Sequence, residues 1–274
     1  MKGLFVALML AVVVPSLEAI PYEDRFSPWF GEPFEIETSA AVILEIYDSF
    51  ATKHCPQHQK TCDAFFELDV TTAIFDGWFL EVQGIAAQTG HKDFNLDAIF
   101  MTGGAKWLND IVGDPVSLAT GITVSQVFKT GLDNIAAFYH GGIEGEFDLV
   151  VGKEYSSMEF WDLRLWSVFG VGGADIGYPW LRWNAALNYN WWDINEVVFT
   201  INTLWGLGHK SLYPGHFRGY GSIRHQSVDI GVGFVHRFES DVSVSASYSY
   251  RVFALNCPKN ANFVGVEFSY PFGL

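Results

Sequence analysis

The sequence predicts an all-β fold, a transmembrane antiparallel up-and-down β-barrel of about twelve strands. Three observations carry this prediction. Apolar and polar residues alternate with a period of two through most of the chain, and the connections alternate between short and long. After Val14, no apolar run is long enough for a membrane-spanning helix. A chain of 274 residues is large enough for one such barrel.

The chain ends in the clearest strand, residues 262–273. Apolar side chains occupy every second position from Val264 to Leu274, with Gly, Glu, Ser, Pro and Gly between them. Successive side chains of a strand point to opposite faces, so one face is apolar. A soluble sandwich could end in the same way. The segment nevertheless resembles the C-terminal assembly signal of Gram-negative outer-membrane β-barrels, although those usually end in Phe rather than Leu.

That resemblance implies a bacterial outer-membrane location. It also implies recognition by the barrel-assembly machinery and contact with outer-membrane lipid and lipopolysaccharide. The overall pattern is similar to that of uncharacterised outer-membrane barrels, including those of chlamydia-like bacteria with cysteine-bearing envelopes.

The N-terminus has the features of a secretory signal peptide. Lys2 precedes the apolar run 3–14, and a small-residue cleavage site follows, ending at Ala19. A buried N-terminal helix is the alternative. We therefore expect a signal peptide at 1–19, a periplasmic N-terminal segment at 20–33 and the barrel at 34–274. The segment 20–33 contains three prolines and no period, and it could also fold into the lumen as a plug.

Each expected strand is near the length that a tilted strand needs to cross a bilayer. The least regular strand is 96–106, because Asp97 occupies one of the alternate positions that should be apolar. The expected strands lie at about 34–47, 64–75, 78–88, 96–106, 115–127 and 262–273, and the clearest alternation of the other six lies within 143–149, 161–166, 182–189, 196–202, 227–235 and 242–252.

The connections favour an outer-membrane orientation. If the C-terminus is periplasmic, the longest connections, 48–63 and 206–225, face outward, and most of the periplasmic turns are short. Aromatic residues such as Trp78 and Trp107 lie at strand ends on the outward parity, as membrane interfaces favour. The formal charge of −15 disfavours nucleic acid as a partner.

The alternate strand positions whose side chains would face the lumen are rich in charged residues. These charged residues are the candidates for lining the pore. Acids crowd the first three strands and the sixth, whereas arginines occupy the seventh, eighth, tenth and eleventh. These candidates are Glu35, Glu37, Glu67, Asp69, Glu144, Glu146, Asp148, Arg164, Arg182, Asp229, Arg237 and Arg251.

Two functions fit this charged inward face. In a hydrated lumen, acidic and basic walls would face each other, which predicts a narrow channel for small polar or cationic solutes. In a closed lumen, ion pairs such as Asp162–Arg182 or Asp229–Arg251 would neutralise the charges, which predicts a structural or adhesive envelope protein.

An enzyme is the third hypothesis. His225 and Ser227 form a His-x-Ser pair that resembles the pair of some outer-membrane lipid hydrolases. Those enzymes present the pair to lipid, whereas here the parity places both residues in the lumen. We therefore predict no catalytic residue. No cofactor is expected, and the irregularly spaced histidines of 209–236 predict no metal site.

Export makes disulfides possible, and the cysteine count of three is odd. Cys55 and Cys62 lie in the first outer loop and Cys257 in the last, and these loops become neighbours when a barrel closes. We expect Cys257 to bond to Cys55 or Cys62. The alternatives are a local Cys55–Cys62 bridge and three free thiols. A leftover thiol could link the protein to an envelope partner.

Overall fold

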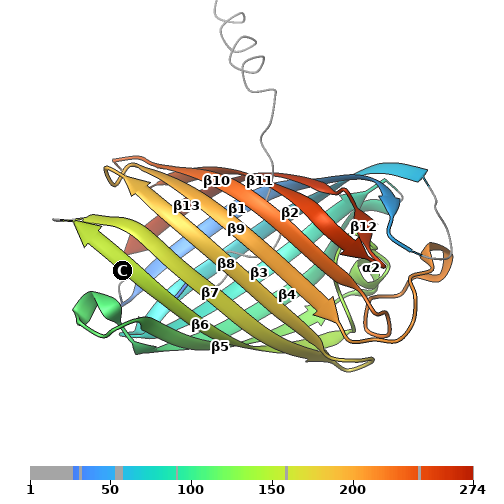
Figure 1. Ribbon diagram of the computed structural model, residues 1–274, viewed down its shortest axis with the longest axis horizontal. Coiled ribbons are helices and arrows are strands. Elements are labelled where there is room, and N and C mark those ends of the chain that lie inside the picture. Colours follow the sequence, from blue (N-terminus) through green and yellow to red (C-terminus); the bar gives the residue numbers. More distant parts are fainter. Residues whose placement is uncertain are drawn as a thin grey trace, which may run out of the picture.

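The computed structural model describes residues 27–30, 33–52, 58–90, 92–157, 160–239 and 242–273. Within them, twelve long strands close a single antiparallel barrel (Figure 1), which confirms the predicted fold. These strands are β1 Glu35–Phe50, β2 His58–Phe75, β3 Trp78–Thr89, β4 Lys92–Leu108, β5 Ser117–Val127, β6 Ile143–Ser157, β7 Phe160–Ala174, β8 Trp180–Trp191, β9 Asn195–Gly206, β10 Gln226–Arg237, β11 Ser243–Leu255 and β13 Asn262–Gly273.

Short elements occupy the connections. They are the helical turn η1 Asp110–Val112, the one-turn helix α2 Lys129–Leu132, the helical turn η2 Pro214–His216 and the two-residue strand β12 Pro258–Lys259. Among the described residues, no helix has the length and apolar character required to cross a bilayer.

The sheet closes where the first strand meets the last. β1 pairs with β2 on one side and with β13 on the other, from Glu35 opposite Gly273 to Ile46 opposite Asn262. Closure leaves none of the twelve long strands described with a free edge. A bilayer would not tolerate such an edge, because lipid tails offer no hydrogen-bond partner.

The outer surface of the barrel is apolar along the strands, as the alternation predicts. Exposed side chains include Leu68 of β2, Phe199 of β9, Ile230 of β10 and Phe268 of β13. A belt of exposed apolar side chains this extensive is stable only against lipid. The described part of the chain therefore has the exterior of a membrane barrel.

A β-bulge resolves the irregular parity of β4. Ile85 of β3 pairs with Ala98 and the next residue, Ala86, pairs with Leu96, so Asp97 is left without a register partner. The extra residue lets both Asp97 and Ala98 turn inward, where both are buried. The Asp97 carboxylate accepts a hydrogen bond from the Asn134 side chain at 3.0 Å.

The long connections gather at one end of the barrel. Figure 1 shows α2 and β12 at that end and the C-terminus at the other. The connection 207–225 is long, as expected, but most of 48–63 is strand, because β1 continues to Phe50 and β2 begins at His58. The periodicity does not predict the role of a second long connection, 128–142, which packs into the mouth of the barrel.

At the opposite end, four described residues of the N-terminal segment lie against the inner wall. The Phe30 ring packs on Phe79 with ring centroids 4.6 Å apart. Trp29 donates from Nε1 to Asp110 at 3.2 Å, and the Arg164 guanidinium lies over its ring. Residues 27–30 thus lie in the lumen, which is the alternative to a periplasmic position for this part of the segment 20–33. The expected signal peptide lies outside the described residues.

The expected disulfide does not form between the described cysteines. Cys62 is exposed and free, and Cys257 is buried, with its thiol donating to the Gln226 carbonyl at 3.3 Å. A Cys62–Cys257 bridge is therefore wrong for this structure, because the two thiols lie in different environments. Cys55 lies outside the described residues, so its pairing stays a prediction.

The orientation can be tested by labelling single cysteines in cells that express a variant without native thiols. Tyr213→Cys, in the exposed part of 207–225, should react with a membrane-impermeant maleimide on intact cells. Val112→Cys, in the exposed turn at the opposite end, is the matched control and should react only after the outer membrane is breached. The reverse labelling pattern would show that the barrel is inserted the other way.

Candidate functional site in the barrel lumen

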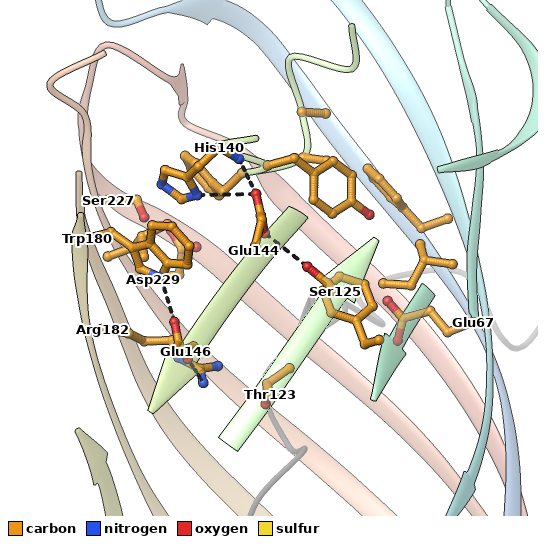
Figure 2. A pocket seen from close by; sticks show the side chains of 18 of the residues that line it. Glu67, Thr123, Ser125, His140, Glu144, Glu146, Trp180, Arg182, Ser227 and Asp229 are labelled. Carbon is orange, nitrogen blue, oxygen red and sulfur yellow. Dashed lines mark hydrogen bonds and ion pairs between the residues drawn. The ribbon is translucent and has the colours of Figure 1, made fainter. Parts of the chain in front are cut away.

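The described residues line two chambers in the lumen, which we name outer and inner after the orientation that the sequence predicts. The outer chamber has a volume of about 120 Å³ and the inner chamber about 290 Å³. Both are lined by Ile43 and Glu67, so they adjoin at the wall formed by β1 and β2. Figure 2 shows the outer chamber with its polar side chains directed toward its interior.

Aromatic loop residues cover the outer chamber. Phe138, Tyr139 and His140 come from the connection 128–142, and they line the chamber. The Tyr220 ring, from the connection 207–225, packs on Phe138 with ring centroids 5.0 Å apart. Tyr220 is fully buried. The two long connections therefore build a hydrophobic closure across the outer mouth, which we call the outer closure.

Two histidines lie buried in the outer closure. His140 stacks on Trp180 with ring centroids 4.0 Å apart, and His225 lies 5.1 Å from His140. Neither ring nitrogen of His140 has a hydrogen-bond partner, nor does Nε2 of His225. Burial lowers the pKa of His225 to about 4 and that of His140 well below its usual value. Both rings are consequently neutral near pH 7.

Arg251 organises one side of the outer chamber. Its guanidinium binds Asp229 in a bidentate pair, at 2.8 and 3.0 Å, and lies 3.6 Å from Glu45. The Phe138 and Phe263 rings flank it, each with its centroid 4.9 Å away. All three charged residues are almost fully buried. The observed Asp229–Arg251 pair is one that the closed-lumen alternative predicts.

Arg182 organises the other side. It pairs with Glu146 and, at 3.1 Å, with Asp148. Trp180 also donates to Glu146 (Figure 2). The predicted Asp162–Arg182 pair is wrong, because the strands place the Arg182 guanidinium against the acids of β6. The arginines are paired locally, so they do not form a separate basic wall facing an acidic one.

Glu144 is held mainly by backbone donors. The N–H groups of His140 and Gly141 donate to its carboxylate, the second at 3.1 Å, and Ser125 donates at 3.4 Å. Its oxygen lies 3.8 Å from the His140 ring nitrogen. The loop that covers the chamber is thereby fixed to the chamber wall.

The inner chamber is lined by carboxylates from β1, β2, β3 and β13. Neutral donors hold several of them: Gln83 donates to Glu67 at 3.3 Å, and Ser245 to Glu267 at 3.3 Å. Ser39 donates a short hydrogen bond to Asp69, and Ser269 donates one to Glu37. The acids in the lining are Glu37, Glu67, Asp69, Glu81 and Glu267.

Three predicted lumen residues lie outside both chamber linings. Arg164 pairs with Glu154 at 2.8 Å, close to the N-terminal residues. Arg237 pairs with Glu196 at 2.6 Å. Glu35 begins β1 at the end of the barrel and is half-buried. The remaining nine candidates line one chamber or both.

His225 and Ser227 lie on the lumenal side of the barrel. Both side chains are buried toward the lumen, as the parity predicts. The His225 Nδ1 atom lies 3.2 Å from the Ile223 carbonyl oxygen, and its ring packs among the aromatic rings of the outer closure. Among the residues that the structure describes, no cluster of His, Cys, Asp or Glu could hold a metal ion.

Sequence reasoning misses the aromatic residues of the site. The strand parity does not single out Phe138, His140 or Trp180, and it does not identify 128–142 as a structured loop. The available signal is the run Ile135-Ala136-Ala137-Phe138-Tyr139, which is too apolar for a solvated outer loop.

Comparisons with known proteins support the fold. No family model matches the sequence, and no curated protein does. The structure is similar to an outer-membrane channel of Pseudomonas putida F1, with a TM-score of 0.60 and 13% identity over 95% of this chain and 100% of that one. It is also similar to the NanC porin, with a TM-score of 0.55 and 10% identity over 86% and 98%. The closed barrel and its apolar exterior place the protein in the bacterial outer membrane.

The Arg251–Asp229 pair should be costly to break on one side. Arg251→Leu leaves two buried carboxylates without their cation and should reduce the free energy of unfolding by roughly 3–5 kcal/mol. The double variant Arg251→Leu/Asp229→Leu should recover part of this loss, as measured by urea unfolding in lipid vesicles. A double variant less stable than Arg251→Leu alone would refute the role of charge compensation.

Acid should weaken the outer closure. Both histidines are neutral when buried, whereas an opened loop binds protons below about pH 6.5. At these two histidines the opened state then binds more protons, so their contribution to the free energy of closure is complete above pH 6.5 and declines as the pH falls toward 4. Amide hydrogen exchange of 128–142, corrected for intrinsic rates, should therefore accelerate at pH 5 relative to pH 7.

The matched variants separate this effect from general acid sensitivity. His140→Phe/His225→Phe should suppress the acceleration, because the phenyl rings keep the packing and bind no proton. His216→Phe, in the exposed part of the neighbouring connection, should retain it. Equal acceleration of amide exchange in the unmodified protein, the double variant and His216→Phe would assign the pH dependence to other groups.

Proposed function

We propose that the protein is a narrow outer-membrane channel for small polar or cationic solutes. The observation that carries this proposal is the acid lining of its two adjoining chambers. The outer chamber contains six carboxylates and two arginines, and the inner chamber contains five carboxylates, with Glu67 in both linings. A water-filled passage with this lining concentrates cations and repels anions.

The closed ends are compatible with this proposal. The outer closure is built from residues of the connections 128–142 and 207–225 rather than from strand residues, and residues 27–30 line the inner chamber at the other end. Loops open over microseconds to seconds without disturbing a sheet. We therefore interpret the structure as an occluded state, which opens when the loops move.

The second candidate is a closed structural or adhesive barrel. The buried Asp229–Arg251 pair and the aromatic packing of the outer closure favour it, because both suit a permanently sealed mouth. Envelope partners bound through a cysteine would fit this alternative, as would the resemblance to barrels of chlamydia-like bacteria. A lipid hydrolase has less support, because His225 and Ser227 face away from lipid.

Conductance of the purified chain in planar bilayers tests the channel. We expect current steps with a reversal potential that indicates cation selectivity. This selectivity should be greater at 0.1 M than at 1 M KCl, because the Debye length falls from about 10 Å to about 3 Å between these concentrations. Glu81→Gln/Asp69→Asn should reduce this selectivity. Asp93→Asn, on the exposed end of β4, is the matched control and should leave it unchanged.

Two outcomes would decide against the proposal. A complete absence of current steps under voltage, including at acid pH, would favour the sealed structural barrel. Anion selectivity would refute the role assigned to the chamber carboxylates.

A further inference from the structure

We propose that the outer chamber is a binding site for a small quaternary ammonium group, such as the head of choline or a betaine. This inference rests on the proposed channel function for its physiological role, since it names a class of solute that the lumen would accept. The juxtaposition that carries it is a shell of aromatic rings around a space whose polar side carries excess carboxylate charge (Figure 2).

The charge around the chamber requires a cation or protons. Arg251 is shared by two carboxylates, Asp229 and Glu45, and the Glu45 Oε1 atom has no hydrogen-bond partner. Glu144 is held by backbone N–H groups and a hydroxyl group, which lower its energy but carry no full charge. Burying such an excess of negative charge is unfavourable unless a positive group or a proton enters.

The aromatic lining selects the type of cation. The rings of Phe65, Phe100, Phe138, Tyr139, Trp180 and Phe263 line the chamber. Aromatic faces attract cations, and the attraction is greatest for organic cations that shed little water. A small inorganic cation would prefer converging oxygen ligands, and the described residues form no metal-binding cluster. A methylated ammonium satisfies both the rings and the carboxylates.

The size of the chamber limits the ligand. Its volume of about 120 Å³ is slightly below that of an engineered apolar cavity of about 150 Å³ that accepts benzene. A tetramethylammonium ion, with five non-hydrogen atoms, is of that order of size, whereas a disaccharide is far too large. His140 also lines the chamber, is 5% exposed, and has two ring nitrogens without partners. It could bind a hydroxyl or carboxylate attached to the ammonium head.

Calorimetric titration of the full-length barrel in detergent tests this site without requiring conduction. Tetramethylammonium chloride should bind saturably, and choline should bind at least as well. Ammonium and Mg²⁺ at matched ionic strength should bind more weakly. The neutral isostere of choline, with carbon in place of nitrogen, should not bind measurably.

Two variants test the rings and the charge separately. Phe138→Leu keeps the apolar contact but removes a ring, and it should weaken tetramethylammonium binding by roughly twofold to thirtyfold. Phe138→Tyr should retain the affinity. Glu144→Gln should also weaken binding, because it removes charge but keeps an oxygen that accepts the loop N–H groups. Phe94→Leu/Asp93→Asn, on the exposed part of β4, is the matched control.

The outcomes separate this inference from the channel proposal. Saturable binding without any bilayer current would support the site and refute the channel. Current without tetramethylammonium binding would refute the site and leave the channel intact. Equal binding of Mg²⁺ or of the neutral isostere would also overturn the site, because it would show a general attraction for cations or a merely apolar cavity. A folding check by circular dichroism accompanies each variant.

Discussion

The pairing of β1 with β13 is the interaction on which the rest of the structure depends. In a bilayer, an unpaired strand edge would leave a row of N–H and C=O groups without partners. Closing the sheet satisfies them, and it also fixes the parity of every strand. Once Val266 and Phe268 face lipid, Gly265 and Glu267 must face the lumen. A shift by one residue would exchange these faces, so the register determines where every charge lies.

The closed ring then creates an electrostatic problem inside the barrel. The inward positions carry many carboxylates, and both ends of the lumen are covered by aromatic residues, which reduces access of water. Local compensation follows: Arg251 lies between Asp229 and Glu45, and Arg182 lies beside Glu146 and Asp148. Each of these two arginines serves two acids, so compensation is incomplete, and in the proposed channel this deficit would favour cations.

Sequence periodicity predicts the strands well because each strand of a membrane barrel carries its own two-residue pattern. The parity of Ser227, Asp229 and Arg251 is sufficient to predict that their side chains face the lumen, where all three are buried. Even Asp97, which breaks the pattern, marks a real irregularity, the bulge in β4. Such signals lie within a single strand. The bilayer enforces them strongly, because the side chains that face lipid must be apolar.

The closures cannot be predicted in the same way, because they depend on contacts between distant segments. His140 meets His225 and Trp180 only after the barrel brings β6, β8 and β10 together. The partner of Arg182 likewise depends on strand stagger, which periodicity does not encode. The inward-folding loop 128–142 has no repeating pattern, and its apolar composition is its sole local signal.

Protons and cations are alternative means of balancing the same buried carboxylates, so their binding must be thermodynamically linked. A cation that enters the outer chamber removes the need for a proton on Glu144 or Glu45, and a proton bound there weakens the attraction for the cation. Reciprocity requires the two effects to be equal in free energy. Acid also charges the histidines of the outer closure when the closure opens and exposes them. One of these histidines, His140, lines the same chamber. A single fall in pH would thus loosen the closure and release the cation beneath it, which would couple opening of the mouth to discharge of the chamber.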